Sequence, residues 1–190
     1  IIGNQTPDWN AGIRNMINYK NISFSFLIDI QEGGDFFSLD TYYGFATGIY
    51  DRSAGLNSLG NPKRDLVANG GGVLLDGVYA DGTQNTIFTE HQNYRNPFGY
   101  KTGIQEQHVW DASYVKLREI RLAYDIPTSI FGGFVNSASL SLIGKNLWII
   151  SKNSPYSDPE FGLSAGNITG YQSGAPLGVK EIGASLKLQF

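Results

Sequence analysis

The chain has 190 residues with 14 Lys+Arg against 17 Asp+Glu, and a formal net charge of −3 argues against a nucleic-acid partner. With no Cys and only two His, the sequence offers little for thiolate, zinc or His-based catalysis, so we expect no enzymatic activity, no metal and no cofactor. No stretch approaches the ~18 continuous apolar residues of a membrane helix. Because the first residue is Ile1 and not Met, we expect the 190 residues to be part of a longer chain.

Strict alternation of apolar and polar residues is the strongest pattern in the sequence, and it predicts antiparallel β-strands with one apolar face each. The clearest case is at the carboxyl end, where every second position from Ile182 to Phe190 is apolar and the positions between them are polar or small. We find no convincing amphipathic helix that would cover these faces. The predicted strands are residues 11–19, 22–30, 113–125, 137–148 and 180–190.

The alternation in residues 113–125 slips by one position near Arg118. Upstream, Val115 and Leu117 are the apolar residues, whereas Ile120 and Leu122 take that role downstream. A β-bulge would produce this slip, because one extra residue exchanges the two faces of a strand. A strand buried on both sides at one end is the alternative explanation.

The connections between the predicted strands alternate between short and long. A tight turn at Lys20 and Asn21 and a short connection at 126–136 alternate with two large loops, residues 31–110 and 149–178. Short periplasmic turns and long extracellular loops are typical of transmembrane β-barrels, and ~9 to 11 tilted residues cross the membrane. The predicted fold is therefore all-β, with antiparallel strands forming the carboxyl-terminal part of a large transmembrane β-barrel.

Five strands cannot close a membrane barrel, since ~8 is the smallest strand number known. We therefore expect further strands upstream of Ile1, odd in number because bacterial barrels have an even total. The predicted topology places Tyr19, Tyr124 and Phe190 at one membrane edge and Trp148 towards the other, as in an aromatic girdle. The alternative is a soluble β-sandwich carbohydrate-binding module, in which the apolar faces meet across the sandwich and which purifies without detergent.

Four sequence segments resemble those of the SusC/RagA-type TonB-linked (TonB-dependent) outer-membrane transporters. The most specific is the run ASYVKLREIRLAYDIP from Ala112 to Pro127. The others, in the family's order, are Gly3 to Trp9 with Tyr19-Lys20-Asn21, then Gly33-Gly34-Asp35, then Gly144-Lys145-Asn146-Leu147 with Asp158-Pro159-Glu160. The resemblance spans nearly the whole chain and is weakest over residues 41–98.

The resemblance implies a location in the cell outer membrane, in contact with its lipid, and about twenty-two strands around an amino-terminal plug. It implies active import of oligosaccharides or peptides, with a SusD-like lipoprotein as a lid and energy from the TonB complex acting through the plug. We find no plug or TonB-interacting segment in these 190 residues. The terminal Phe190 matches the aromatic residue that the barrel-assembly machinery recognises in such proteins.

Two groups of residues are candidates for contacts inside such a barrel. Charged residues of alternating sign occupy the face opposite the apolar one, and we expect them to meet water, each other or the plug. Tyr side chains among amides and carboxylates in residues 31–110 suit sugar or peptide binding, a protein interface with the lid, or packing of the loop on itself. The charged candidates are Arg14, Asp29, Glu119, Arg121, Asp125, Glu181 and Lys187, and the tyrosines are Tyr42, Tyr43, Tyr50, Tyr79, Tyr94 and Tyr100.

Three further motifs favour a structural explanation over a chemical one. Asp158-Pro159-Glu160 and the segment from Asp76 to Gly82 bring carboxylates near turns, as calcium sites do, but Asp-Pro and Asp-Gly are also common turn formers. Carboxylate pairs such as Glu90 with Glu106 or Asp158 with Glu160 lack the supporting residues of a glycosidase. Residues 70–72, three glycines, lack the Lys-Ser/Thr of a phosphate-binding loop and suit a tight turn.

Overall fold

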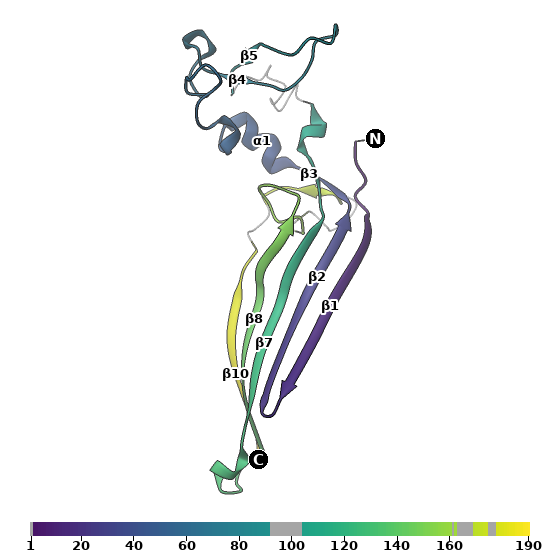
Figure 1. The fold of residues 1–190 in the computed structure, drawn as a ribbon, viewed down its shortest axis with the longest axis vertical. Coiled ribbons are helices and arrows are strands. Elements are labelled where there is room, and N and C mark those ends of the chain that lie inside the picture. The colour runs from purple at the N-terminus through teal and green to yellow at the C-terminus, as the bar shows by residue number, and fades with distance from the viewer. Residues whose placement is uncertain (1, 92–103, 161, 163–168, 175–177) are drawn as a thin grey trace.

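The computed structural model describes residues 2–91, 104–160, 162, 169–174 and 178–190. The molecule has two parts, a long curved sheet and an irregular lobe at one end of it (Figure 1). None of the helices among the described residues is long and apolar enough to cross a membrane.

Five antiparallel strands form the long sheet, so the predicted all-β antiparallel class is confirmed. Their order across the sheet is β1-β2-β7-β8-β10. Several run beyond the predicted ranges, because backbone pairing continues where the apolar alternation has ended. The observed strands are β1 (Pro7–Tyr19), β2 (Ile22–Gly33), β7 (Tyr114–Ile126), β8 (Ser137–Lys152) and β10 (Glu181–Gln189).

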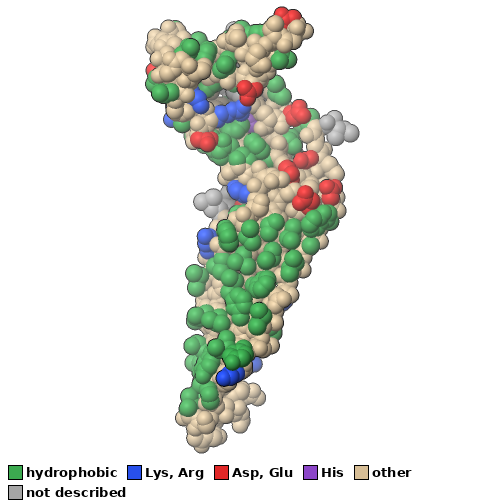
Figure 2. Space-filling model, in the orientation of Figure 1, with side chains coloured by type: hydrophobic (Ala, Val, Ile, Leu, Met, Phe, Trp, Pro, Cys, Tyr) green, Lys and Arg blue, Asp and Glu red, His purple; other side chains and the backbone are tan. Residues whose placement is uncertain are grey.

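One face of this sheet is apolar across all five strands. Cross-strand pairing aligns Ile17, Phe24, Leu122, Leu142 and Ala184 in one continuous row. Neighbouring rows repeat the pattern, so hydrophobic side chains cover the sheet in the space-filling view (Figure 2). Exposed fractions along the face are high: 57% for Ile17, 54% for Leu142 and 83% for Ile182. No described element covers this face, which argues against a sandwich in which apolar faces meet each other.

The phase slip near Arg118 is a β-bulge, which confirms one of the two explanations that the sequence left open. Leu27 pairs with Glu119 and the next residue, Ile28, pairs with Leu117, so Arg118 has no partner on β2. It has none on β8 either. The extra residue brings Arg118 onto the polar face beside Glu119 and leaves Leu117 and Ile120 on the apolar face.

The expected positions of the aromatic residues follow from the same register. Tyr19 pairs with Ile22, which pairs with Tyr124, at the end of the sheet that carries the β1–β2 turn. The ring of Phe190 lies at that end too, 5.3 Å from the ring of Phe134. Trp148 pairs with Leu117 in the other half of the sheet.

The two predicted large loops contain short elements that the sequence pattern does not predict. Gly33 and Gly34, with φ of +74° and +82°, turn the chain from β2 into the lobe, a conformation that favours glycine. Two small sheets follow, with the orders β6-β3-β9 and β4-β5. The short strands are β3 (Asp35–Ser38), β4 (Val73–Leu74), β5 (Phe88–Thr89), β6 (Val109–Asp111) and β9 (Tyr171–Gln172), with 3₁₀ turns η1 (Asp51–Ser53), η2 (Val67–Asn69) and η3 (Gln105–His108). A fourth 3₁₀ turn, η4 (Thr128–Phe131), lies in the short connection between β7 and β8.

The described residues include one α-helix, α1 (Leu39–Thr47), although the sequence pattern predicts no amphipathic helix. Ser38 caps its first turn, since the Ser38 hydroxyl accepts a hydrogen bond of 3.1 Å from the Thr41 amide. Gly48 ends it in the left-handed conformation. The helix has only nine residues, too few for a clear periodic pattern, and it packs within the lobe and not over the apolar face of the sheet (Figure 1).

Candidate functional site

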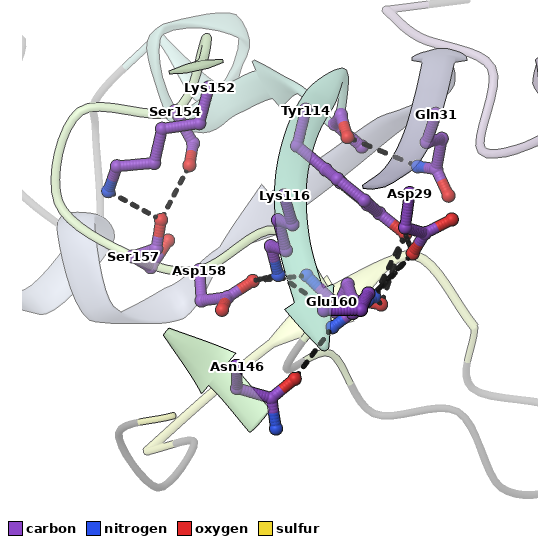
Figure 3. Close-up of polar contacts among 12 residues, drawn as sticks. Asp29, Gln31, Tyr114, Lys116, Asn146, Lys152, Ser154, Ser157, Asp158 and Glu160 are labelled. Atoms are coloured by element: carbon purple, nitrogen blue, oxygen red, sulfur yellow. Dashed lines mark hydrogen bonds and ion pairs between the residues drawn. The ribbon is translucent and has the colours of Figure 1, made fainter. Parts of the chain in front are cut away.

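A polar network joins the polar face of the sheet to the loop that follows β8 (Figure 3). Its residues come from β2, β7 and the loop, and we call it the wall network. It consists of Asp29, Tyr114, Lys116, Arg118, Asp158 and Glu160.

Lys116 lies at the centre of the wall network. Its side chain is only 5% exposed, and its ammonium group forms ion pairs with both Asp158 and Glu160. A buried ammonium group is tolerated only when it is paired, so these two carboxylates hold the loop against β7. The sequence predicts Lys116 as a polar residue of an alternating strand but gives no sign of this pairing, since its partners lie more than 40 positions away.

Arg118 extends the wall network across the sheet. Its Nε and Nη2 atoms donate hydrogen bonds of 2.8 and 2.7 Å to the same oxygen of Asp29, and Nη2 also pairs with Glu160. The Tyr114 hydroxyl donates to Asp29 over 3.1 Å and to Glu160 over 3.0 Å as alternative acceptors. Burial alone would raise the pKa of Glu160, but the hydrogen bonds and charges of Arg118 and Lys116 hold it below its usual range. The β-bulge is what brings Arg118 onto this face.

The predicted turn at Asp158-Pro159-Glu160 is present. The Glu160 amide donates a hydrogen bond of 3.1 Å to the Asp158 side chain, as in an Asx turn. Both carboxylates are engaged by basic side chains, so the structural explanation of this motif is favoured over a cation site. Among the described residues, no group of three His, Asp or Glu side chains is placed to hold a metal ion.

The charged candidates on the strands lie on the face opposite the apolar one. Arg14 reaches over Leu27 to Glu119, with 3.5 Å between Nη2 and Oε1. Glu119 pairs in register with Lys145 and Lys145 with Glu181, so charges of alternating sign cross the sheet in a row. Near the β1–β2 turn, Asp125 and Lys187 both pair with Ser139, and Arg121 donates a hydrogen bond of 3.0 Å to Ser141.

The tyrosine candidates separate into three groups. Tyr42 and Tyr50 pack within the lobe, Tyr42 against Phe37 and Tyr50 against Tyr156, whose ring centre lies 4.2 Å away. Tyr43 is 54% exposed and Tyr79 is 39% exposed, so their surfaces remain accessible. The last two, Tyr94 and Tyr100, lie outside the described residues.

An aromatic cluster around His108 forms the interior of the lobe. The imidazole is fully buried, and its ring centre lies 5.3 to 5.9 Å from those of Phe37, Tyr42 and Phe45. Nδ1 lies 3.3 Å from the Thr41 hydroxyl. Burial, with a smaller contribution from the charge of Arg52, lowers the pKa of His108 to about 4. His108 could not be identified as a core residue from the sequence, because a lone histidine carries no pattern.

The stability of the lobe is therefore expected to depend on His108 in acid. Above pH 6.5 the side chain is neutral in both folded and unfolded chains, so it has no effect on the pH dependence. Between pH 6.5 and about 4 only the unfolded chain binds the proton, which lowers the free energy of unfolding by up to about 3 kcal/mol, after which the loss levels off. Amide hydrogen exchange of residues 39–48, corrected for the pH dependence of the intrinsic exchange rate, measures this fall in the free energy of unfolding.

In a His108→Gln variant the same measurement should show no such loss between pH 6.5 and 4. The variant will be less stable at pH 7.5, and the smaller acid dependence that remains is expected from His91, whose pKa is lowered by burial and by the charge of Arg64. An unaltered acid dependence would show that His108 is not its source.

No protein-family model matches the sequence. TonB-dependent receptor P26 from Formosa agariphila is 28% identical over 200 residues, covering 100% of this chain and 18% of that receptor. TonB-dependent receptor P3 from the same organism is 26% identical over 161 residues, covering 84% of this chain and 13% of that receptor.

The chain is similar to TonB-dependent receptors. The resemblance predicted from the sequence is thereby confirmed, and it agrees with the predicted location in the outer membrane. The chain spans less than a fifth of the length of these relatives.

Solved structures show the same fold. A chain of the RagAB peptide importer in the closed-closed state matches with a TM-score of 0.64 and 18% identity, covering 100% of this chain and 18% of that chain. The open-open state matches with a TM-score of 0.62 and 19% identity over 97% of this chain and 17% of that chain. The five strands of this TonB-dependent-receptor-like chain therefore form part of a much larger structure in proteins of similar fold.

Proposed function

We propose that the chain supplies five adjacent wall strands and two external loops of an outer-membrane TonB-dependent nutrient transporter. The transporter imports oligosaccharides or peptides, works with a SusD-like lipoprotein lid, and draws energy from the TonB complex through a plug in another part of the longer protein. The similarity to TonB-dependent receptors and to the fold of the RagAB peptide importer supports this proposal.

The uncovered apolar face is the observation that carries the proposal. Rows of side chains such as Ile17, Leu122 and Leu142 remain exposed over the whole sheet. In water this arrangement would leave a far larger apolar patch than soluble monomers expose. In a bilayer the same side chains meet acyl chains, while the charged face borders a water-filled interior.

The role of this part of the protein is mechanical. The strands hold the wall, and the wall network fixes the loop after β8 to its inner side. The lobe between β2 and β7 stands at the end of the sheet remote from the β1–β2 turn, where it shapes the external entrance and presents Tyr43 and Tyr79 to the lid or the substrate (Figure 1).

Energised uptake tests the proposed function. Cells that carry the full-length gene should accumulate a fluorescent oligosaccharide or peptide substrate, and removal of either TonB or the partner lipoprotein should abolish the accumulation. Uptake that continues at the same rate without TonB would contradict the proposal.

Contact between the charged face and the plug has its own test at Arg121. An Arg121→Glu variant should lower uptake severalfold, because it reverses a charge that faces the plug, while the amount of folded receptor in the outer membrane stays the same. Glu substitution at Lys20, in the β1–β2 turn, is the charge-matched control and should leave uptake intact. Normal uptake by Arg121→Glu would exclude a functional contact with the plug.

A further inference from the structure

A pocket of about 370 Å³ opens beside the wall network, where the second half of β8 runs past the start of β10. β10 begins at Glu181, which pairs with Lys145, so β8 has no β10 neighbour from Asn146 onward. The volume of the pocket lies in the range of small-ligand pockets. Basic residues dominate its charged lining, which comprises Lys116, Arg118, Lys152 and Lys180 against Asp158 and Glu160.

Two of these basic residues have no carboxylate of their own. Lys116 and Arg118 are paired with the wall-network carboxylates, whereas neither Lys152 nor Lys180 forms an ion pair with any described residue. The Lys152 ammonium donates a hydrogen bond of 2.9 Å to the Ser157 carbonyl, a neutral group. Asp158 attracts Lys152 electrostatically, but its ion pair is with Lys116.

Lys152 and Lys180 lie over a fixed, partly buried floor in which Lys116 and Arg118 are already paired with carboxylates. Lys116 is almost fully buried, and Arg118 is held by hydrogen bonds to Asp29, so neither can turn away to solvent. A carboxylate on the ligand would give Lys152 and Lys180 the ion pairs that they lack.

An aromatic ring adds a second feature of the pocket. Tyr156 lines it, and the Tyr156 hydroxyl donates a hydrogen bond of 2.7 Å to Asp51. A flat ring beside hydrogen-bond donors suits a cyclic or planar group that carries an anion.

The geometry points to a binding site for an anionic group, a carboxylate or sulfate, carried by the oligomer that the receptor imports. Lys152 and Lys180 contact the anion, and the paired side chains of Lys116 and Arg118 form the fixed floor beneath it. The inference rests on the proposed function for the source of the ligand, but the pocket itself is defined by the residues described above.

Binding to the intact receptor in detergent tests the site. Trigalacturonate is the anionic probe and maltotriose the neutral one, both measured by calorimetry at low ionic strength. A Lys152→Gln/Lys180→Gln double variant should bind trigalacturonate about tenfold more weakly than the wild type, since two charge-assisted contacts are lost. The Lys20→Gln variant, altered in the distant β1–β2 turn, should bind as the wild type does.

Two outcomes would overturn the inference. One is that the wild type and the double variant bind trigalacturonate with equal affinity, or that neither binds it. The other is a loss of copurifying phosphate-bearing lipid in the double variant with no change in trigalacturonate binding, which would assign the lysines to lipid contact.

The result is separable from the proposed function. Lysine-dependent trigalacturonate binding by a receptor that shows no TonB-dependent uptake would support the site and contradict the transport. TonB-dependent uptake together with trigalacturonate binding that does not depend on the two lysines would support the transport and contradict the site.

Discussion

Arginine in place of Leu122 is expected to destabilise the folded receptor in lipid by about 2 to 4 kcal/mol, the cost of a guanidinium group near the middle of the lipid-facing surface. Leu122 lies within an apolar row of five strands and is 45% exposed in the absence of lipid. Denaturant unfolding of the full-length receptor in vesicles measures the loss, and the fraction that remains folded in the outer membrane should fall in parallel.

Ser185→Arg provides the matched control. Ser185 is exposed on the polar face of β10, one position from the row that contains Leu122. The same side chain there should cost less than about 1 kcal/mol, because it projects into water. Equal destabilisation by the two substitutions would contradict the assignment of the faces.

Loss of the Lys116 ammonium group is expected to release the loop after β8. A Lys116→Met variant leaves Asp158 and Glu160 close together on a partly buried surface without their shared cation. Breaking a buried pair on one side costs about 3 kcal/mol, which corresponds to roughly a hundredfold higher population of the detached loop. The rate of protease cleavage within residues 153–160 measures this population.

Charge repair distinguishes this effect from a general loss of stability. Adding Asp158→Asn and Glu160→Gln to Lys116→Met removes the repulsion and should restore part of the resistance to cleavage. Lys20→Met, at the far end of the sheet, should leave the loop as resistant as in the wild type. Wild-type cleavage of Lys116→Met would show that the loop is held by other contacts.

The long sheet could be predicted because each of its strands has a repeating pattern. Period-2 alternation over nine or more residues identifies both a strand and its faces, and the slip at Arg118 was visible as a change of phase. The similarity to TonB-dependent receptors likewise rested on residues of these strands and the segments next to them.

The lobe and the wall network could not be predicted in the same way. Strands of two to four residues and the nine-residue helix α1 are too short for periodicity, and they form because Phe45, His108 and Tyr156 pack together from distant parts of the chain. The wall network depends on pairing Lys116 with carboxylates more than 40 positions away, which no local pattern encodes. Asp158-Pro159-Glu160 was recognised as a turn, but not as the anchor of a loop.

Lipid contact along the apolar face can be measured directly on β10. The 190 residues contain no Cys, so single cysteines at positions 182 to 189 of an otherwise cysteine-free receptor can be spin-labelled in vesicles and tested for collision with oxygen, which concentrates in lipid, and with a water-soluble nickel chelate. Labels at the sites of Ile182, Ala184, Leu186 and Leu188 should collide mainly with oxygen, and labels at Gly183, Ser185 and Lys187 mainly with nickel. Even-numbered labels that are shielded from both reagents, or open to nickel, would show that this face is buried in protein or lies in water, and would contradict the account.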